Sequence, residues 1–87
     1  MPGPFSSAIT LSWNANTETD LAGYRVYYGR SSGVYDGHVS AGLATSGQVT
    51  ITESGLWFFA VTAFDTSNNE SDYSAEVSRN WLLMGNF

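Results

Sequence analysis

The sequence predicts an all-β sandwich formed by one small domain. Apolar and polar residues alternate over several short stretches, clusters of turn-forming residues separate these stretches, and no helical periodicity lasts longer than one turn. This combination is typical of two packed antiparallel sheets. A chain of 87 residues suits a single domain and buries only about 60–68% of its unfolded surface, so its core must hold large side chains. Three tryptophans, five tyrosines and five phenylalanines meet this requirement.

The first two strands are predicted from alternation. Residues 1–7 contain two prolines and form an extended lead-in, and residues 8–13 form the first strand. After a polar turn, residues 23–29 form the second strand. The apolar positions of these two strands are expected to face the core: Ile9, Leu11, Trp13, Tyr24, Val26 and Tyr28.

The middle of the chain is richer in turns. Three glycines in residues 30–42 indicate loops around a short strand. Residues 48–52 form a further strand, with Val49 and Ile51 facing inward. Residues 53–55 then turn the chain.

Residues 56–64 form the longest predicted strand, because the stretch is too short for a capped helix and rich in aromatic residues. One face is expected to build the core: Trp57, Phe59, Val61 and Ala63. The opposite face is also mostly apolar: Phe58, Ala60, Thr62 and Phe64. A wet sheet face would alternate more cleanly, so this second face presents apolar surface. A polar loop over residues 65–72 and a last strand over residues 73–79 follow.

Three segments of the chain, residues 9–14, 20–29 and 59–71, resemble parts of fibronectin type III domains of the bacterial and phage kind. In order, they are similar to the B strand, the C strand, and the F strand with its following loop. The resemblance covers about residues 8–79 and implies an immunoglobulin-like β-sandwich. It also implies that Trp13 is the central tryptophan of the B strand and that Leu21 fills the corner between the B and C strands.

Three features depart from this family pattern. Trp57 stands where the family has a tyrosine whose hydroxyl fixes the corner before the F strand. The first strand of the family is short or degenerate here, which leaves a sheet edge able to pair with another strand. Residues 81–87 form an apolar C-terminal tail without a counterpart in the family. We therefore expect a domain over residues 1–80 followed by this tail.

Composition argues against several classes of function. The chain has no cysteine, so disulfides and thiolate metal sites are excluded. A net charge of −5, with three arginines and no lysine, argues against nucleic acid and anionic membranes as partners. No apolar run approaches the ~20 residues of a spanning helix, and we expect no signal peptide in this chain.

No catalytic, cofactor-binding or metal-ligating residue is assigned. His38 is the only histidine and is expected to be a solvated loop residue, because catalytic and metal sites need partners. Residues 65–72 are rich in oxygen ligands but lack the glycine pivot and spaced acid of a calcium loop. We therefore expect a protein that is not an enzyme and uses no cofactor.

Two groups of residues are candidates for an interface. The first lies on the outer face of the sheet that contains residues 23–29 and 56–64: Arg25, Tyr27, Phe58 and Phe64. The second is in the tail: Trp81, Leu82, Leu83, Met84 and Phe87. The outer aromatics could equally be ordinary scattered surface residues or be covered by the tail. The tail could complete the depleted sheet, be the start of a following domain, or reach a neighbouring subunit, and the last is favoured.

These features predict a non-enzymatic structural or assembly module. Domains of this kind decorate bacteriophage capsids and tails, so the resemblance implies a small virion protein that contacts a capsid or tail scaffold, or neighbouring copies of itself. A virion or extracellular location is expected. The alternative is a spacer or carbohydrate-accessory domain of a secreted bacterial enzyme or adhesin. Binding to a host-cell receptor through the outer aromatics is a third hypothesis.

Overall fold

The structure is a computed structural model that describes residues 7–81. Within that range it contains six strands and no helix. The strands are β1 (Ser7–Ser12), β2 (Leu21–Gly29), β3 (Gly37–Gly42), β4 (Ser46–Ile51), β5 (Gly55–Asp65) and β6 (Val77–Trp81). Gly42 ends β3 at a φ of 59° and Gly55 begins β5 at a φ of 129°, conformations that larger residues rarely adopt.

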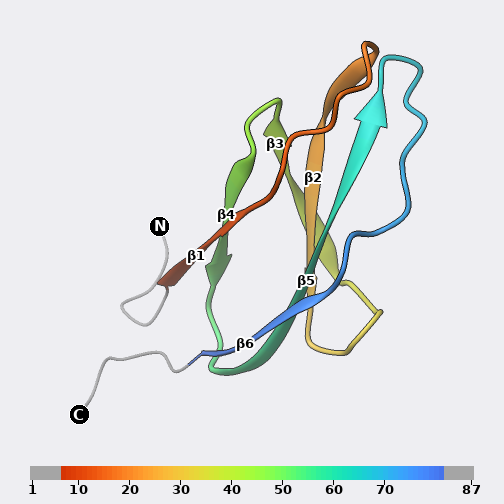
Figure 1. The fold of residues 1–87 in the computed structure, drawn as a ribbon. Helices are drawn as coiled ribbons and strands as arrows, with labels where there is room; N and C mark the ends of the chain where they lie inside the picture. The colour runs from red at the N-terminus through yellow and green to blue at the C-terminus, as the bar shows by residue number, and fades with distance from the viewer. Residues whose placement is uncertain (1–6, 82–87) are drawn as a thin grey trace.

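The strands form two antiparallel sheets that pack face to face as a sandwich (Figure 1). β1 pairs with β4 in one sheet, and the other sheet has the order β3-β2-β5-β6. The chain therefore crosses between the sheets from β1 to β2, from β3 to β4 and from β4 to β5. The all-β sandwich that the sequence predicts is confirmed.

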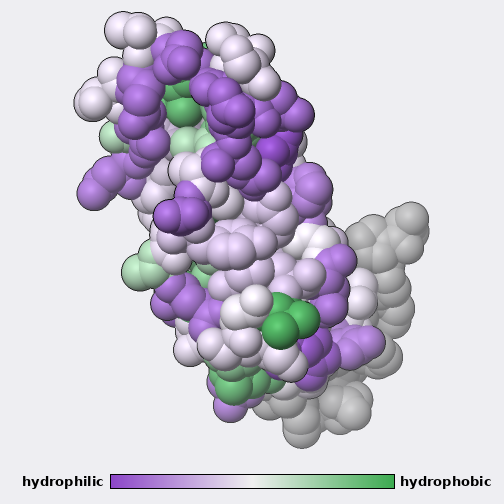
Figure 2. Space-filling model, turned by 90° about the vertical axis from the view of Figure 1, so that its right-hand side faces the viewer, coloured by the Kyte–Doolittle hydropathy of each residue, from purple (hydrophilic) through white to green (hydrophobic). Residues whose placement is uncertain are grey.

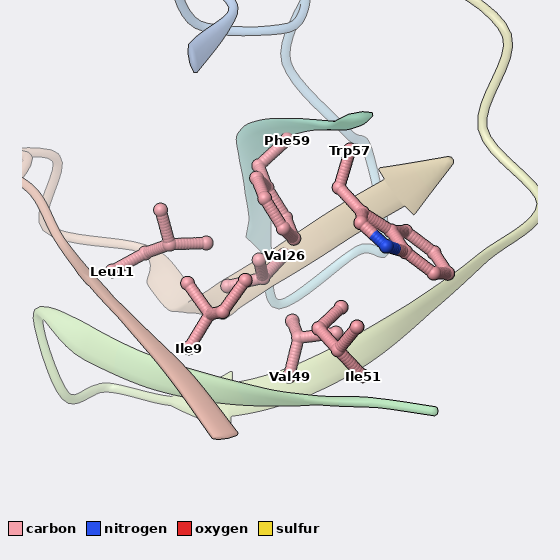
Figure 3. Packing of buried hydrophobic residues seen from close by; sticks show 7 residues of the cluster. All are labelled: Ile9, Leu11, Val26, Val49, Ile51, Trp57 and Phe59. Atoms are coloured by element: carbon pink, nitrogen blue, oxygen red, sulfur yellow. The ribbon is translucent and has the colours of Figure 1, made fainter. Parts of the chain in front are cut away.

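The core lies between the two sheets, where side chains from both converge (Figure 3). Ile9 and Val49 are paired across the β1–β4 ladder, so both side chains point into the sandwich. Val26 of β2 is paired with Val61 of β5 and faces them from the other sheet. The buried cluster consists of Ile9, Leu11, Val26, Val49, Ile51, Trp57 and Phe59.

The structure distributes the thirteen residues that the sequence places in the core over two levels of burial. Eight are buried: Ile9, Leu11, Tyr24, Val26, Val49, Ile51, Trp57 and Phe59. Five are half-buried: Trp13, Leu21, Tyr28, Val61 and Ala63. Trp13, Tyr28 and Val61 pack against the margin of the buried cluster. Leu21 and Ala63 line a hollow at the end of β5, where the register of β2 on β5 shifts.

Trp57 ties the turn between β4 and β5 to the sheet. Its indole N–H donates a hydrogen bond of 3.1 Å to the carbonyl of Glu53. The Arg30 guanidinium lies 4.7 Å from the centre of the same indole and donates to the Glu53 carboxylate and to the carbonyls of Ser54 and Leu56. The Trp57 indole and the Arg30 guanidinium thus both bind the backbone of this turn.

The segment between β5 and β6 runs beside β5 without forming a regular strand until Val77. Ser71 and Ser74 donate their backbone N–H groups to the carbonyls of Ala63 and Val61. Their hydroxyl oxygens accept the N–H groups of the same two β5 residues, at 2.9 Å each. Side-chain oxygens thus replace backbone carbonyls in this part of the ladder, so the prediction of a strand beginning at residue 73 is wrong.

The placement of Trp81 in an apolar tail is also wrong. β6 continues to Trp81, which pairs with Gly55 at the start of β5. Its side chain is half-buried and packs against the core cluster, because the antiparallel ladder extends beyond the predicted end of the last strand. Trp81 therefore belongs to β6 and to the margin of the core. The other tail candidates, Leu82, Leu83, Met84 and Phe87, lie outside the described residues. The predicted degenerate first strand also lies outside them.

Replacing Phe59 and its neighbour Phe58 tests the assignment of the two faces of β5. Phe59→Ala should lower the free energy of unfolding by about 3–5 kcal/mol, because it leaves a cavity in the core. Phe58→Ala should cost clearly less, because Phe58 points to the opposite face and is only half-buried. Urea denaturation followed by tryptophan fluorescence measures both losses. Equal losses would show that the assigned directions are wrong.

Candidate functional site

The outer face of the four-stranded sheet gathers aromatic side chains from four parts of the chain. Paired residues of antiparallel strands share a face, so Tyr27 of β2 lies beside Ala60 of β5 and His38 of β3. Tyr35 comes from the loop after β2, and Tyr73 comes from the irregular segment before β6. Their rings meet those of the sheet. We refer to Tyr27, Tyr35, His38 and Tyr73 as the aromatic face.

The Tyr27 ring contacts each of the other three rings. The centroid of Tyr27 lies 4.9 Å from that of His38, 5.1 Å from that of Tyr73 and 6.2 Å from that of Tyr35. Tyr35 and Tyr73 are 4.9 Å apart. The Tyr27–Tyr73 pair is close to perpendicular at 82°, an edge-to-face arrangement that aromatic rings favour.

The Glu70 carboxylate holds Tyr27 in place. The hydroxyls of Tyr27 and Thr62 both donate to one of its oxygens, and Arg25 forms an ion pair of 3.1 Å with the other. The hydrogen bonds from Thr62 and Tyr27, together with the charge of Arg25, hold the pKa of Glu70 below its ordinary value. Burial and the bond to Glu70 raise the pKa of Tyr27. Thr62 is only 3% exposed, so Glu70 also satisfies a buried hydroxyl of the sheet.

Glu76 does the same for Tyr35. Its carboxylate accepts hydrogen bonds from the Tyr35 hydroxyl at 2.6 Å, the Ser32 hydroxyl at 2.5 Å and the Gly33 N–H at 2.8 Å. Burial and the bond to Glu76 raise the pKa of Tyr35 to about 12. The three donors lower the pKa of Glu76. The loop after β2 is thereby fastened to the segment that leads into β6.

Tyr73 is the most exposed of the three tyrosines of the aromatic face. It is 52% exposed and stands edge-on to both Tyr27 and Tyr35. The backbone beside it is fixed, because the N–H of Ser74 donates to the carbonyl of Val61 in β5. The exposed Tyr73 ring therefore packs on the rings of Tyr27 and Tyr35, whose hydroxyls are hydrogen-bonded to carboxylates.

At the other end of β5, Phe64 is partly covered by the protein itself. The Arg25 guanidinium lies 4.1 Å from the centre of the Phe64 ring. Gly23 lies beneath the ring, where a Cβ would come within 2.9 Å of a ring carbon. Phe64 and Leu21 line a hollow whose other lining residues are mostly polar or acidic. Figure 2 views the side along which the segment before β6 runs, and shows a hollow of this kind with hydrophobic atoms at its base and hydrophilic residues around it.

The loop after β5 is organised by its own side chains. The carboxylate of Asp65 accepts the N–H groups of Ser67 and Asn69 and the Asn69 side-chain amide, which lowers the pKa of Asp65. Asn68 adopts a φ of 65° and accepts a hydrogen bond from Arg25. Within residues 7–81 no group of three or more histidine and acidic side chains is arranged to hold a metal ion. No helix of that range is long and apolar enough to span a membrane.

The structure brings together only part of the predicted interface. Arg25 and Tyr27 lie within the same network around Glu70. Phe58 shares their face and is half-buried beside Gly29 and Ser78. Phe64 lies at the far end, beneath Arg25.

Three residues of the aromatic face are absent from the predicted interface. His38 is expected in a loop, but it lies in β3. His38 is paired with Tyr27, which follows only from the β2–β3 register. Tyr35 and Tyr73 lie outside regular strands, so the alternation of apolar and polar residues does not predict on which face of the sheet their side chains lie. The arrangement offers stacking surfaces and fixed carboxylates, which suit binding.

Glu70→Gln should make stability less dependent on pH under acid conditions. The pKa of Glu70 is lower in the folded chain than its ordinary value of 4.5, so the ionised carboxylate stabilises the fold above that pH. This contribution is lost as the pH falls below 4.5 and through the lowered pKa. The free energy of unfolding, measured by urea denaturation from about pH 6 to about pH 3, should therefore fall more steeply for the wild type than for the variant. A constant difference between them would contradict this account.

Comparison of the chain with family models, with curated proteins and with solved structures gave no match.

Proposed function

We propose that this chain is a non-enzymatic binding module of the fibronectin type III kind that docks on a protein partner through its aromatic face. The observation that carries the proposal is the half-exposed Tyr73 ring, seated on two tyrosines that Glu70 and Glu76 hold in place. Tyrosine is enriched among the residues that dominate binding energy at protein interfaces. A ring held before binding loses less conformational entropy when a partner covers it.

The order of the strands supports the fibronectin-like part of the proposal. With β1 and β4 as strands B and E, and β2, β5 and β6 as strands C, F and G, the two sheets follow the arrangement of immunoglobulin-like sandwiches. The donor at the corner before β5, supplied by Trp57, agrees with this alignment.

The biological setting remains a prediction from the sequence. Assembly on a capsid or tail scaffold of a virion requires the kind of protein-binding surface that the aromatic face offers. A carbohydrate-accessory role is the second candidate, because tyrosine rings beside carboxylates also suit stacking on sugars. The two roles differ in whether a protein or a glycan binds to Tyr73.

Tyr73→Ser should abolish or strongly weaken capture of the protein partner while changing the free energy of unfolding little. The reason is that Tyr73 is 52% exposed and contributes more to the surface than to the core. The measurement compares the proteins captured by the immobilised wild type and variant from extracts of the cells or particles that contain the protein. Leu43→Ser is the matched control, since Leu43 is 64% exposed in the turn between β3 and β4. This variant should capture the partner as well as the wild type does. Equal capture by wild type and Tyr73→Ser would overturn the proposal, and binding to glycans alone would favour the second candidate.

The apolar residues after Trp81 are the second predicted contact, with neighbouring copies or a scaffold. A double change of Leu83→Ser and Met84→Ser should reduce the mass of any complex in solution, because it removes apolar contact area. Light scattering on the wild type and the variant measures this mass. If both proteins are equally monomeric and bind the scaffold equally, the tail has no role in assembly.

A further inference from the structure

A hollow on the outer face of the sheet is lined by Tyr27 and Tyr73, whose rings are in contact with each other. Thr62, Glu70, Ser71 and Asp72 complete its lining, and its volume is about 380 Å³. The two rings are close to perpendicular, at 82°, with their centroids 5.1 Å apart. The residues that line the hollow therefore include two tyrosines and two acidic residues.

We propose that this hollow binds a cationic side chain, an arginine or a lysine, of the protein partner. The inference rests on the proposed function and adds to it the chemistry of the group that is recognised. The ligand is a guanidinium or ammonium group that contacts the ring of Tyr73 and pairs with the carboxylate of Asp72.

At two other places in the chain, an aromatic ring and a carboxylate together bind one arginine side chain. Arg25 lies 4.1 Å from the centre of the Phe64 ring while it forms an ion pair with Glu70. Arg30 lies 4.7 Å from the centre of the Trp57 ring while it forms an ion pair with Glu53. In both places one arginine makes a cation–π contact with a ring and an ion pair with a carboxylate at the same time.

The pair formed by Tyr73 and Asp72 offers the same two groups without a cation. The Asp72 carboxylate makes no hydrogen bond or ion pair with any residue between 7 and 81. Glu76, which lies under Tyr35, also has no cation paired with it in this range. Arg25 forms its ion pair with Glu70, a third acidic residue of this face. The surface around Tyr73 is therefore acidic, as is the whole chain with its net charge of −5.

A cation gains two favourable interactions at this position. It is attracted by the electron-rich face of a tyrosine ring, and it neutralises a carboxylate that now faces water. A neutral polar group would gain only the hydrogen bond, and an anion would be repelled. Arginine fits better than lysine, because its planar guanidinium can stack on the ring and bind the carboxylate with two N–H groups.

The test titrates the folded full chain with a blocked glycine-arginine-glycine peptide and follows the amide and tyrosine ring signals by NMR. The arginine peptide should shift the signals of Tyr27, Asp72 and Tyr73, and the same peptide with neutral citrulline should not. Asp72→Asn should weaken binding by about two- to fivefold, and Tyr73→Leu by a similar factor. Glu18→Gln removes the same charge outside this hollow and should leave the affinity nearly unchanged.

Three outcomes would overturn the inference. These are equal binding of the citrulline and arginine peptides, shifts that map to another face, and an unchanged affinity of Tyr73→Leu for the arginine peptide. Failure of the proposed function itself is distinguishable from these, since it appears as full capture of the protein partner by Tyr73→Ser. If the peptide does not bind but Tyr73→Ser still loses the partner, the docking face stands and the cationic ligand is wrong.

Discussion

The pairing of β2 with β5 is the constraint on which the rest of the structure depends. The register that places Val26 beside Val61 in the core also places Arg25 beside Thr62 on the outer face. One alignment thus builds the hydrophobic core and the candidate binding surface together. A slip of one residue would exchange the two faces, burying the Arg25 guanidinium and exposing Val26, so both faces specify the same register.

Carboxylates fasten the irregular segments to this sheet. Glu70 joins the segment before β6 to Thr62 and Tyr27, Glu76 joins it to the loop after β2, and Glu53 binds Arg30. The two ion pairs among these contacts, Arg25–Glu70 and Arg30–Glu53, contribute about 0–1 kcal/mol each, so they organise the surface more than they stabilise the fold. Acidic residues therefore have structural roles here in addition to giving the chain its negative charge.

The same network links structure to the proposed binding. Tyr27 and Tyr35 have their hydroxyls occupied, which leaves their rings as a fixed base for Tyr73. Asp72 stands beside this base with its carboxylate unpaired among residues 7–81. A preorganised aromatic surface with acidic residues that no cation neutralises favours a partner that supplies both apolar area and a cation.

Apart from the bounds of the last strand, the sequence by itself determined where the strands lie and the direction of their core residues. Alternation is a local property, so it placed Ile9, Val49 and Phe59 inward without knowledge of which strands pair. The aromatic face was decided by tertiary structure. Tyr73 depends on contacts with residues distant in the sequence, in a segment where hydroxyls replace the ladder carbonyls. Trp81 packs against the core because β6 extends along β5 as far as Gly55. The pairing of the two strands decides this extent, and the local sequence pattern does not.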